Sequence, residues 1–310
     1  MPPFVTPPAQ LARSIRSTIV GQVGVVEGLL LAVIAGGHVL LEGPPGLAKT
    51  LACRALAAAI GGRFQRVQFT PDLLPSDVVG TRIFDQKSGE FSVALGPIFA
   101  NVLLADEINR APAKVQSALL EAMQERQVTI GPTSFALPDP FVVMATMNPL
   151  DIDGTYALPQ AQMDRFLLNV IVDYPSHAEE LVILERFAGG EPPLPTNVVT
   201  MEDVLAWRKE ARAIFLDEKI KAYIVNIVLA TRVKHRYLDR GASPRATLAL
   251  ASLARARALL EGRDYVLPDD VRSLARVVLG HRLVFNYRTV TDQIAIGAIV
   301  DELIASVPVP

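Results

Sequence analysis

One stretch of the sequence, Gly43-Pro-Pro-Gly-Leu-Ala-Lys-Thr50, constrains the fold more than any other. The apolar segment 38–42 runs into it, and an apolar helical pattern over residues 51–60 follows it. A glycine-rich loop between a buried strand and a helix lets backbone N–H groups turn toward phosphate oxygens, and the helix N-terminus adds partial positive charge. The sequence therefore predicts an α/β fold that carries a phosphate-binding loop (P-loop).

The side chains of this loop suit a magnesium nucleotide. Lys49 is expected to reach the β- and γ-phosphates, and the Thr50 hydroxyl is expected to ligate Mg²⁺. The strict motif has glycine where this chain has Ala48. Alanine is the smallest substitute, and we expect it to enter the right-handed helix; a need for positive φ there would weaken the interpretation. The alternative is an ordinary glycine-rich turn followed by a chance Lys-Thr pair. The residues expected to contact nucleotide here are Gly43, Pro44, Pro45, Gly46, Leu47, Ala48, Lys49, Thr50 and Leu51.

A second apolar strand pattern, residues 101–105, ends in two carboxylates. Ligands collect at the carboxyl edge of a parallel sheet, so Asp106 and Glu107 are expected beside the P-loop. Asp106 is placed to hold Mg²⁺ or its bound water, and Glu107 to orient and deprotonate the water that attacks ATP. Taken alone, the pair also fits a solvated helix start with acidic first residues.

The chain divides by pattern into two parts. Up to the Pro- and Gly-rich segment 189–197, strand and helix patterns alternate, which indicates an α/β domain with a mostly parallel sheet. Two probable hairpins, near 80–96 and 128–137, look like insertions into that layer. Beyond the segment the pattern is helical. We expect a P-loop domain over residues 1–192 and a helical domain over 197–310.

Composition limits the classes of partner and compartment. Acidic and basic residues number 32 and 30, which gives no support for a nucleic-acid or polybasic membrane surface. The longest apolar stretch, residues 23–41, contains Glu27, His38 and four glycines, and fits a buried helix followed by a strand better than a membrane span. The chain has one cysteine, Cys53, so no intrachain disulfide forms and a cytoplasmic location is expected.

In their order and spacing these segments resemble the MoxR family of AAA+ ATPases. The resemblance is carried by the P-loop together with LLADEINR at 103–110, and it covers nearly the whole chain. It implies an AAA+ αβα P-loop domain with a mostly parallel sheet, an all-helical lid domain, and ATP and Mg²⁺ as cofactors. The further matching segments are SALLEAMQERQ at 117–127, MATMNP at 144–149, AQMDRF at 161–166 and SPRA at 243–246.

The resemblance assigns roles to three further polar residues. Asn148 follows an apolar strand pattern and becomes sensor 1, near the γ-phosphate; an Asn-Pro turn is the alternative. Arg165 becomes an arginine finger that acts on a neighbouring subunit, and a plain Asp–Arg pair is the alternative. Arg245 becomes sensor 2. A cation in the first turn of a helix opposes the helix dipole, so Arg245 makes more sense beside an anion than as a solvated side chain.

Two smaller expectations concern the rim of the nucleotide site. Val20, Gly21 and Gln22 lie in a segment that resembles the one packing against adenine in this family. Gln68 is a candidate for coupling Glu107 to the ligand state, and Arg110 is a candidate for acting in trans or for being a simple exposed arginine.

As a whole, the resemblance implies a motor that hydrolyses ATP in a homo-oligomeric ring, a hexamer by family likeness. Such a motor remodels or activates client proteins, often ones with a von Willebrand A domain, and helps to insert metal cofactors. The two hairpins are then partner or substrate loops. A magnesium-chelatase-type motor subunit is the first alternative. A nucleic-acid motor is the second, and the near-neutral charge argues against it.

Overall fold

The computed structural model describes residues 8–87, 89–148, 156–190 and 193–310. The chain forms two compact units. The first comprises residues up to 158 together with 170–205, and the second comprises 159–169 together with 206–310. The domain limits expected from composition, 1–192 and 197–310, remain a prediction. Among the described residues, no helix is both long enough and apolar enough to cross a membrane.

A five-stranded sheet organises the first unit, in the order β2-β5-β8-β1-β9. The pairs β2–β5, β5–β8 and β8–β1 are parallel, so their carboxyl ends share one edge. Asp106 is opposite Gln68 in the register, and Glu42 is opposite Met147. The strands are β1 (Val39–Glu42), β2 (Phe64–Gln68), β5 (Val102–Asp106), β8 (Val142–Met147) and β9 (Leu168–Ile171).

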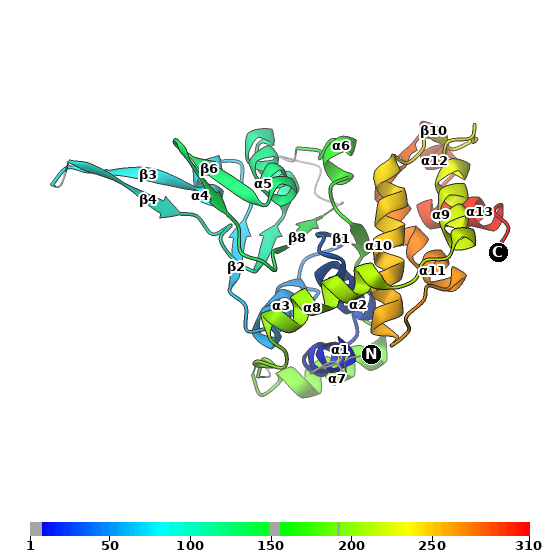
Figure 1. Ribbon diagram of the computed structural model, residues 1–310, viewed down its shortest axis with the longest axis horizontal. Helices are drawn as coiled ribbons and strands as arrows, with labels where there is room; N and C mark the ends of the chain where they lie inside the picture. The colour runs from blue at the N-terminus through cyan, green and yellow to red at the C-terminus, as the bar shows by residue number, and fades with distance from the viewer. Residues whose placement is uncertain (1–7, 88, 149–155, 191–192) are drawn as a thin grey trace. The chain divides into compact units, whose positions relative to one another are not determined.

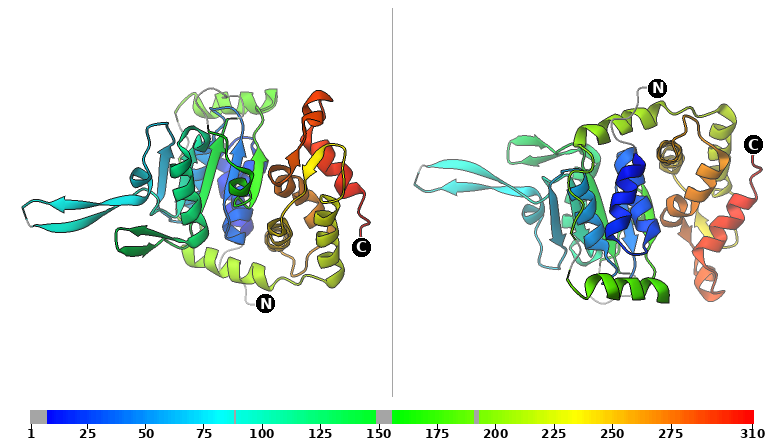
Figure 2. Two further views of the ribbon diagram at one scale, coloured as in Figure 1. Left: turned by 90° about the horizontal axis from the view of Figure 1, so that it is seen from above. Right: turned by 90° about the horizontal axis from the view of Figure 1, so that it is seen from below.

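Helices cover both faces of this sheet, which gives the expected αβα layering. Helices α2 and α3 lie on one face and α5 on the other (Figure 2). Helix α2 reads VGVVEGLLLAVIA and is buried along most of its length, because it packs between the sheet and its neighbours. It ends at Gly36, whose φ of 74° suits glycine. The helices are α1 (Pro8–Thr18), α2 (Val23–Ala35), α3 (Lys49–Ala59), α4 (Pro75–Val79), α5 (Ala113–Glu125) and α7 (His177–Phe187), with the 3-10 turn η1 (Ile108–Arg110).

Two antiparallel hairpins extend from the first unit. Strand β3 (Gly80–Asp85) pairs with β4 (Glu90–Leu95), and β6 (Gln127–Ile130) pairs with β7 (Thr133–Ala136). Both project in the same direction, and the β3–β4 hairpin reaches much farther from the sheet (Figure 1). On one face of that hairpin the rings of Phe84 and Phe91 lie 5.0 Å apart, and the guanidinium of Arg82 covers Phe91.

The second unit is built mainly from helices, which confirms the helical lid. It also contains a small antiparallel pair, β10 (Leu238–Arg240) with β11 (Val284–Phe285), which the sequence analysis did not predict. The helices are α6 (Gln160–Met163), α9 (Glu218–Ala230), α10 (Pro244–Leu260), α11 (Pro268–Leu279), α12 (Tyr287–Thr291) and α13 (Ile296–Ala305), with the 3-10 turn η2 (Gly280–Arg282). Helix α8 (Met201–Ala213) begins in the first unit and continues into the second.

Three buried side chains serve as internal markers. Trp207, the only tryptophan of the chain, belongs to the second unit and is 2% exposed. His281 is also in the second unit and is 5% exposed, and its Nε2 lies 3.2 Å from the carbonyl oxygen of Phe166. Cys53 is buried in α3 of the first unit, where burial first, and then the negative charge of Asp106, raise the pKa of its thiol.

Candidate functional site

The P-loop follows β1 and turns into α3. Gly46 has a φ of 83°, which suits glycine. Ala48 has a φ of 55° and a ψ of 16°, so it is a left-handed residue and not part of the right-handed helix. The expectation that alanine simply enters the helix is therefore wrong. The backbone turns at Ala48 before α3 begins at Lys49. The left-handed conformation of Ala48 costs about 1–2 kcal/mol relative to a right-handed one.

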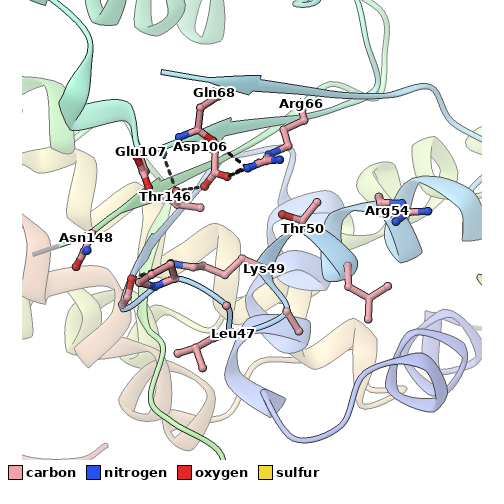
Figure 3. Close-up of a pocket in the computed structure, with 15 residues that line it drawn as sticks. Leu47, Lys49, Thr50, Arg54, Arg66, Gln68, Asp106, Glu107, Thr146 and Asn148 are labelled. Atoms are coloured by element: carbon pink, nitrogen blue, oxygen red, sulfur yellow. Dashed lines mark hydrogen bonds and ion pairs between the residues drawn. The ribbon is translucent and has the colours of Figure 1, made fainter. Parts of the chain in front are cut away.

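The loop borders a cavity of about 350 Å³. Figure 3 shows polar side chains from four segments turned toward this space. Gly43, Asp106, Glu107 and Asn148 line it together with residues 45–51, whereas Pro44 is not among the lining residues. The remaining lining residues are Arg54, Arg66, Gln68 and Thr146. One cavity thus collects the loop and the polar strand ends that the sequence singled out.

Lys49 points its ammonium group back along the loop. Its Nζ donates a hydrogen bond to the carbonyl oxygen of Gly43 over 2.8 Å. Burial lowers the pKa of Lys49, and the negative charges of Asp106 and Glu107 oppose that change. The ammonium group is therefore partly desolvated and lies near two carboxylates. This arrangement suits a bound anion that carries a metal ion, because the ammonium group attracts the anion and the carboxylates attract the metal ion.

A threonine hydroxyl ties the two carboxylate residues together. Oγ1 of Thr146 donates to Oδ1 of Asp106 over 2.6 Å and accepts from the backbone N–H of Glu107 over 2.8 Å. Thr146 is 1% exposed, so its hydroxyl does not exchange readily with water. Glu107 has a φ of 56°, a strained conformation for a side chain of its size. The Thr146 bridge holds this strained backbone at the end of β5.

Two arginines contact the same carboxylates. Nη2 and Nε of Arg66 lie 2.6 and 3.1 Å from Oδ2 of Asp106, and Nη2 also donates to Oε1 of Gln68 over 2.9 Å. Nη1 of Arg110 donates to Oε2 of Glu107 over 3.1 Å. Gln68, which the sequence offered as a coupling residue, thus contacts Arg66, and Arg110 contacts Glu107 of the same chain. The roles considered for Gln68 and Arg110 stay predictions.

The segment expected at adenine shapes the start of α2. Gln22 has a φ of 51° and donates from Nε2 to the carbonyl oxygen of Asp173 over 3.0 Å. Gly21 has a φ of 64°, and a Cβ there would lie 2.6 Å from a carboxylate oxygen of Glu179. Neither these residues nor Val20 are among those that line the P-loop cavity.

Arg165 and Arg245 belong to the second unit. Ser243 caps the N-terminus of α10, because its Oγ accepts from the N–H of Arg245 over 3.1 Å. The same hydroxyl donates to Oδ2 of Asp164 over 2.7 Å, and Nε of Arg282 donates to Oδ1 of Asp164 over 2.8 Å. Asp164 therefore joins the segment that carries Arg165 to the start of the helix that carries Arg245. Arg165 is half-buried and Arg245 is exposed.

Sequence reasoning missed Thr146 and Arg66. A signal existed for both. Thr146 is the one residue with a hydroxyl in the apolar run of β8. Arg66 and Gln68 are two positions apart on β2, the strand that pairs with β5. Alternation places the two side chains on one face of the sheet, but their proximity to Asp106 depends on the strand order.

Comparison with known proteins places this arrangement in context. Residues 38–168 match the family described as "ATPase family associated with various cellular activities (AAA)", and residues 230–303 match the AAA lid domain. The chain is 47% identical to "Chaperone MoxR1" of Mycobacterium tuberculosis, over 96% of this chain and 80% of that protein. It is 32% identical to "Protein MoxR" of Methylorubrum extorquens, over 89% of this chain and 87% of that protein.

A solved structure is also similar. The crystal structure of a putative ATPase from Cytophaga hutchinsonii superposes with a TM-score of 0.91 and is 42% identical. The match covers 97% of this chain and 94% of that one. The likeness therefore includes both the P-loop unit and the helical lid.

Proposed function

Because the chain belongs to the MoxR family of AAA+ ATPases, we propose that it binds Mg·ATP in the P-loop cavity and uses hydrolysis to remodel partner proteins. The observation that carries this proposal is the meeting of Lys49, Asp106, Glu107 and Asn148 around one cavity beside the loop. Such a constellation supplies what phosphoryl transfer needs, namely positioning and charge stabilisation.

The residues present fit a magnesium nucleotide. The hydroxyl of Thr50 and the carboxylate of Asp106 offer the hard oxygen ligands that Mg²⁺ prefers. In the part of the chain that the structure describes, no group of three or more His, Cys, Asp or Glu side chains forms a metal cage. Two protein ligands, with phosphates and water as the others, are the usual arrangement for Mg²⁺ on a nucleotide. Lys49 and the loop N–H groups would hold the phosphates, and the metal would neutralise charge on the transferred phosphate.

The acidic strand end supplies the proton chemistry. Glu107 is assigned to orienting and deprotonating the attacking water, with the Thr146 bridge holding its backbone. Asn148 is assigned to aligning that water or the γ-phosphate through its amide. Arg110 donates to Oε2 of Glu107, and the second carboxylate oxygen, Oε1, can accept a proton from water.

The lid and a neighbouring subunit would complete the site. We assign Arg165 as an arginine finger donated to the next subunit, and Arg245 as a sensor that contacts the phosphates. A finger in trans requires a ring of subunits, and a hexamer is the expected size. The half-burial of Arg165 and the anchoring of its neighbour Asp164 to Ser243 and Arg282 support a rigidly held side chain.

Work on a client protein is the proposed outcome of hydrolysis. The name of the Mycobacterium tuberculosis relative, a chaperone, supports this role. Clients with a von Willebrand A domain, assistance in metal cofactor insertion, and a cytoplasmic location are part of the same proposal. A magnesium-chelatase-type motor subunit is the second candidate, favoured by the two hairpins.

The test is steady-state ATP hydrolysis as a function of protein concentration, with Mg²⁺. The variants are Glu107→Gln, Arg165→Ala and a control, Arg240→Ala, which removes an exposed arginine of β10. We expect turnover per subunit to rise as the chain assembles. Glu107→Gln and Arg165→Ala should bind ATP but lose most turnover, and the control should match wild type.

Two results would contradict the proposal. Turnover per subunit that is independent of concentration, with Arg165→Ala as active as wild type, would remove the shared site and leave a monomeric ATPase. Full activity of Glu107→Gln would remove the assigned base.

A further inference from the structure

Both oxygens of the Asp106 carboxylate accept hydrogen bonds from neighbouring side chains. Thr146 donates to Oδ1, and two nitrogens of Arg66 donate to Oδ2. Asp106 is 17% exposed, so little of its carboxylate remains open to water. Oδ2 thus carries two donors and Oδ1 carries one, so a cation that binds Oδ2 must compete with Arg66 for that oxygen.

The two partners differ in how readily they can leave. The Thr146 hydroxyl is buried and also accepts the N–H of Glu107, so its release would leave a buried donor unpaired. The side chain of Arg66 is 49% exposed and can be rehydrated as it moves. Its Nη2 already contacts Gln68, which lies on the same face of β2 and offers the guanidinium a second acceptor. Arg66 is thus the replaceable partner.

A guanidinium and a divalent cation cannot share one carboxylate oxygen, because like charges a few ångströms apart repel strongly in a partly buried site. Resting on the proposed use of Asp106 in holding Mg²⁺, we propose that Arg66 is a positioning residue whose contact with Oδ2 of Asp106 competes with Mg²⁺ and is displaced when Mg²⁺ binds with nucleotide. Through this ion pair Arg66 offsets the negative charge of the Asp106 carboxylate. It also makes the side-chain arrangement of β2 depend on the metal rather than on nucleotide alone.

The inference predicts a thermodynamic coupling that can be measured without turnover. Displacing Arg66 opposes metal binding, so removing it should strengthen the effect of Mg²⁺ on nucleotide affinity. The quantity to measure is the ratio of two dissociation constants for a fluorescent ADP, one in EDTA and one in MgCl₂, by anisotropy. Effects of a substitution on nucleotide binding itself cancel in this ratio.

Four proteins are compared: wild type, Arg66→Gln, Arg66→Lys and the control Arg63→Gln. Arg63 is exposed, immediately precedes β2 and is not among the residues lining the cavity, so its loss removes the same charge elsewhere. Because an exposed ion pair of this kind is weak, the ratio should rise about twofold to fivefold in Arg66→Gln. It should rise less in Arg66→Lys, which keeps the charge but lacks the planar fork, and stay at the wild-type value in the control.

A ratio in Arg66→Gln equal to or below that of wild type would overturn the inference. Equal increases in Arg66→Gln and Arg63→Gln would also overturn it, since net charge alone would then explain the effect. These results leave the proposed function intact. Failure of the wild-type protein to bind the fluorescent ADP under either condition would instead refute the proposed function, and the inference would fall with it. Circular dichroism of each variant checks the fold.

Discussion

His281 should make the second unit sensitive to acid. Burial lowers its pKa to about 3, and the adjacent positive charge of Arg282 adds to the effect. An unfolded chain gives histidine a pKa of about 6.5, so between these values the unfolded state binds a proton that the folded state excludes. The stability that the neutral, buried His281 contributes is therefore fully present above the unfolded-state pKa, and it is lost as the pH falls toward the folded-state pKa.

The size of the loss follows from the two pKa values. Between pH 8 and pH 5 the folded histidine stays neutral while the unfolded one becomes charged. The free energy of unfolding should therefore fall by about 2 kcal/mol from this residue alone. Below pH 5 the loss should continue at about 1.4 kcal/mol per pH unit until the folded pKa is approached.

Trp207 provides the assay, because it is the only tryptophan and lies buried in the same unit. Urea unfolding is followed by tryptophan fluorescence at pH 8 and pH 5 for wild type and His281→Gln. Glutamine can reach the Phe166 carbonyl in place of Nε2 and does not titrate. The variant should lose about 2 kcal/mol less than wild type between the two pH values. An equal loss in both proteins would refute the reasoning, whatever the stability of the variant at pH 8.

Three further outcomes are expected. Ala48→Gly should stabilise the first unit by about 0.5–1 kcal/mol, because glycine removes the left-handed strain, although the greater entropy of the unfolded chain offsets part of this gain. Thermal unfolding measures the change, and a less stable variant would contradict the prediction. Thr146→Val should lower ATP turnover about tenfold while Thr146→Ser keeps it, because only the hydroxyl joins Asp106 to Glu107; equal rates in both variants would exclude the bridge. Asp270→Ala should lower the free energy of unfolding, followed by Trp207 fluorescence, by about 3–5 kcal/mol, because Arg263 then loses the buried carboxylate to which it donates two short hydrogen bonds. A change below about 1 kcal/mol would contradict this prediction.

The parts of the fold that the sequence could predict have local signals. Two strands have an apolar run followed by a chemically distinctive end: the strand before the P-loop leads into the glycine-rich loop, and the other ends at Asp106. The αβα layering follows from their alternation. Strand β9 was missed because LNVI is short and contains an asparagine, and its place in the sheet depends on distant segments. Helix α7 could have been found, since Ser176 and Glu179 form a capping box at its start.

The site shows the same division. Lys49, Asp106 and Glu107 are recognisable because each follows a local pattern, whereas Arg66 and Thr146 matter only through the strand order that brings them to Asp106. Ala48 shows a different limit. The sequence indicates which residue occupies the position, but φ at that position is set by the turn that the whole loop must make. The roles of Arg165 and Arg245 depend on assembly and ligand, which no pattern within one chain can determine.

Because Cys53 is buried, the rate at which its thiol reacts can report local opening of α3. It is the only thiol, and its pKa is raised, so an added disulfide reagent can react only when α3 separates from the sheet. The labelling rate then measures how often the helix behind the P-loop opens. A ligand held by that loop would slow the labelling in proportion to its occupancy, without any reporter being added to the protein.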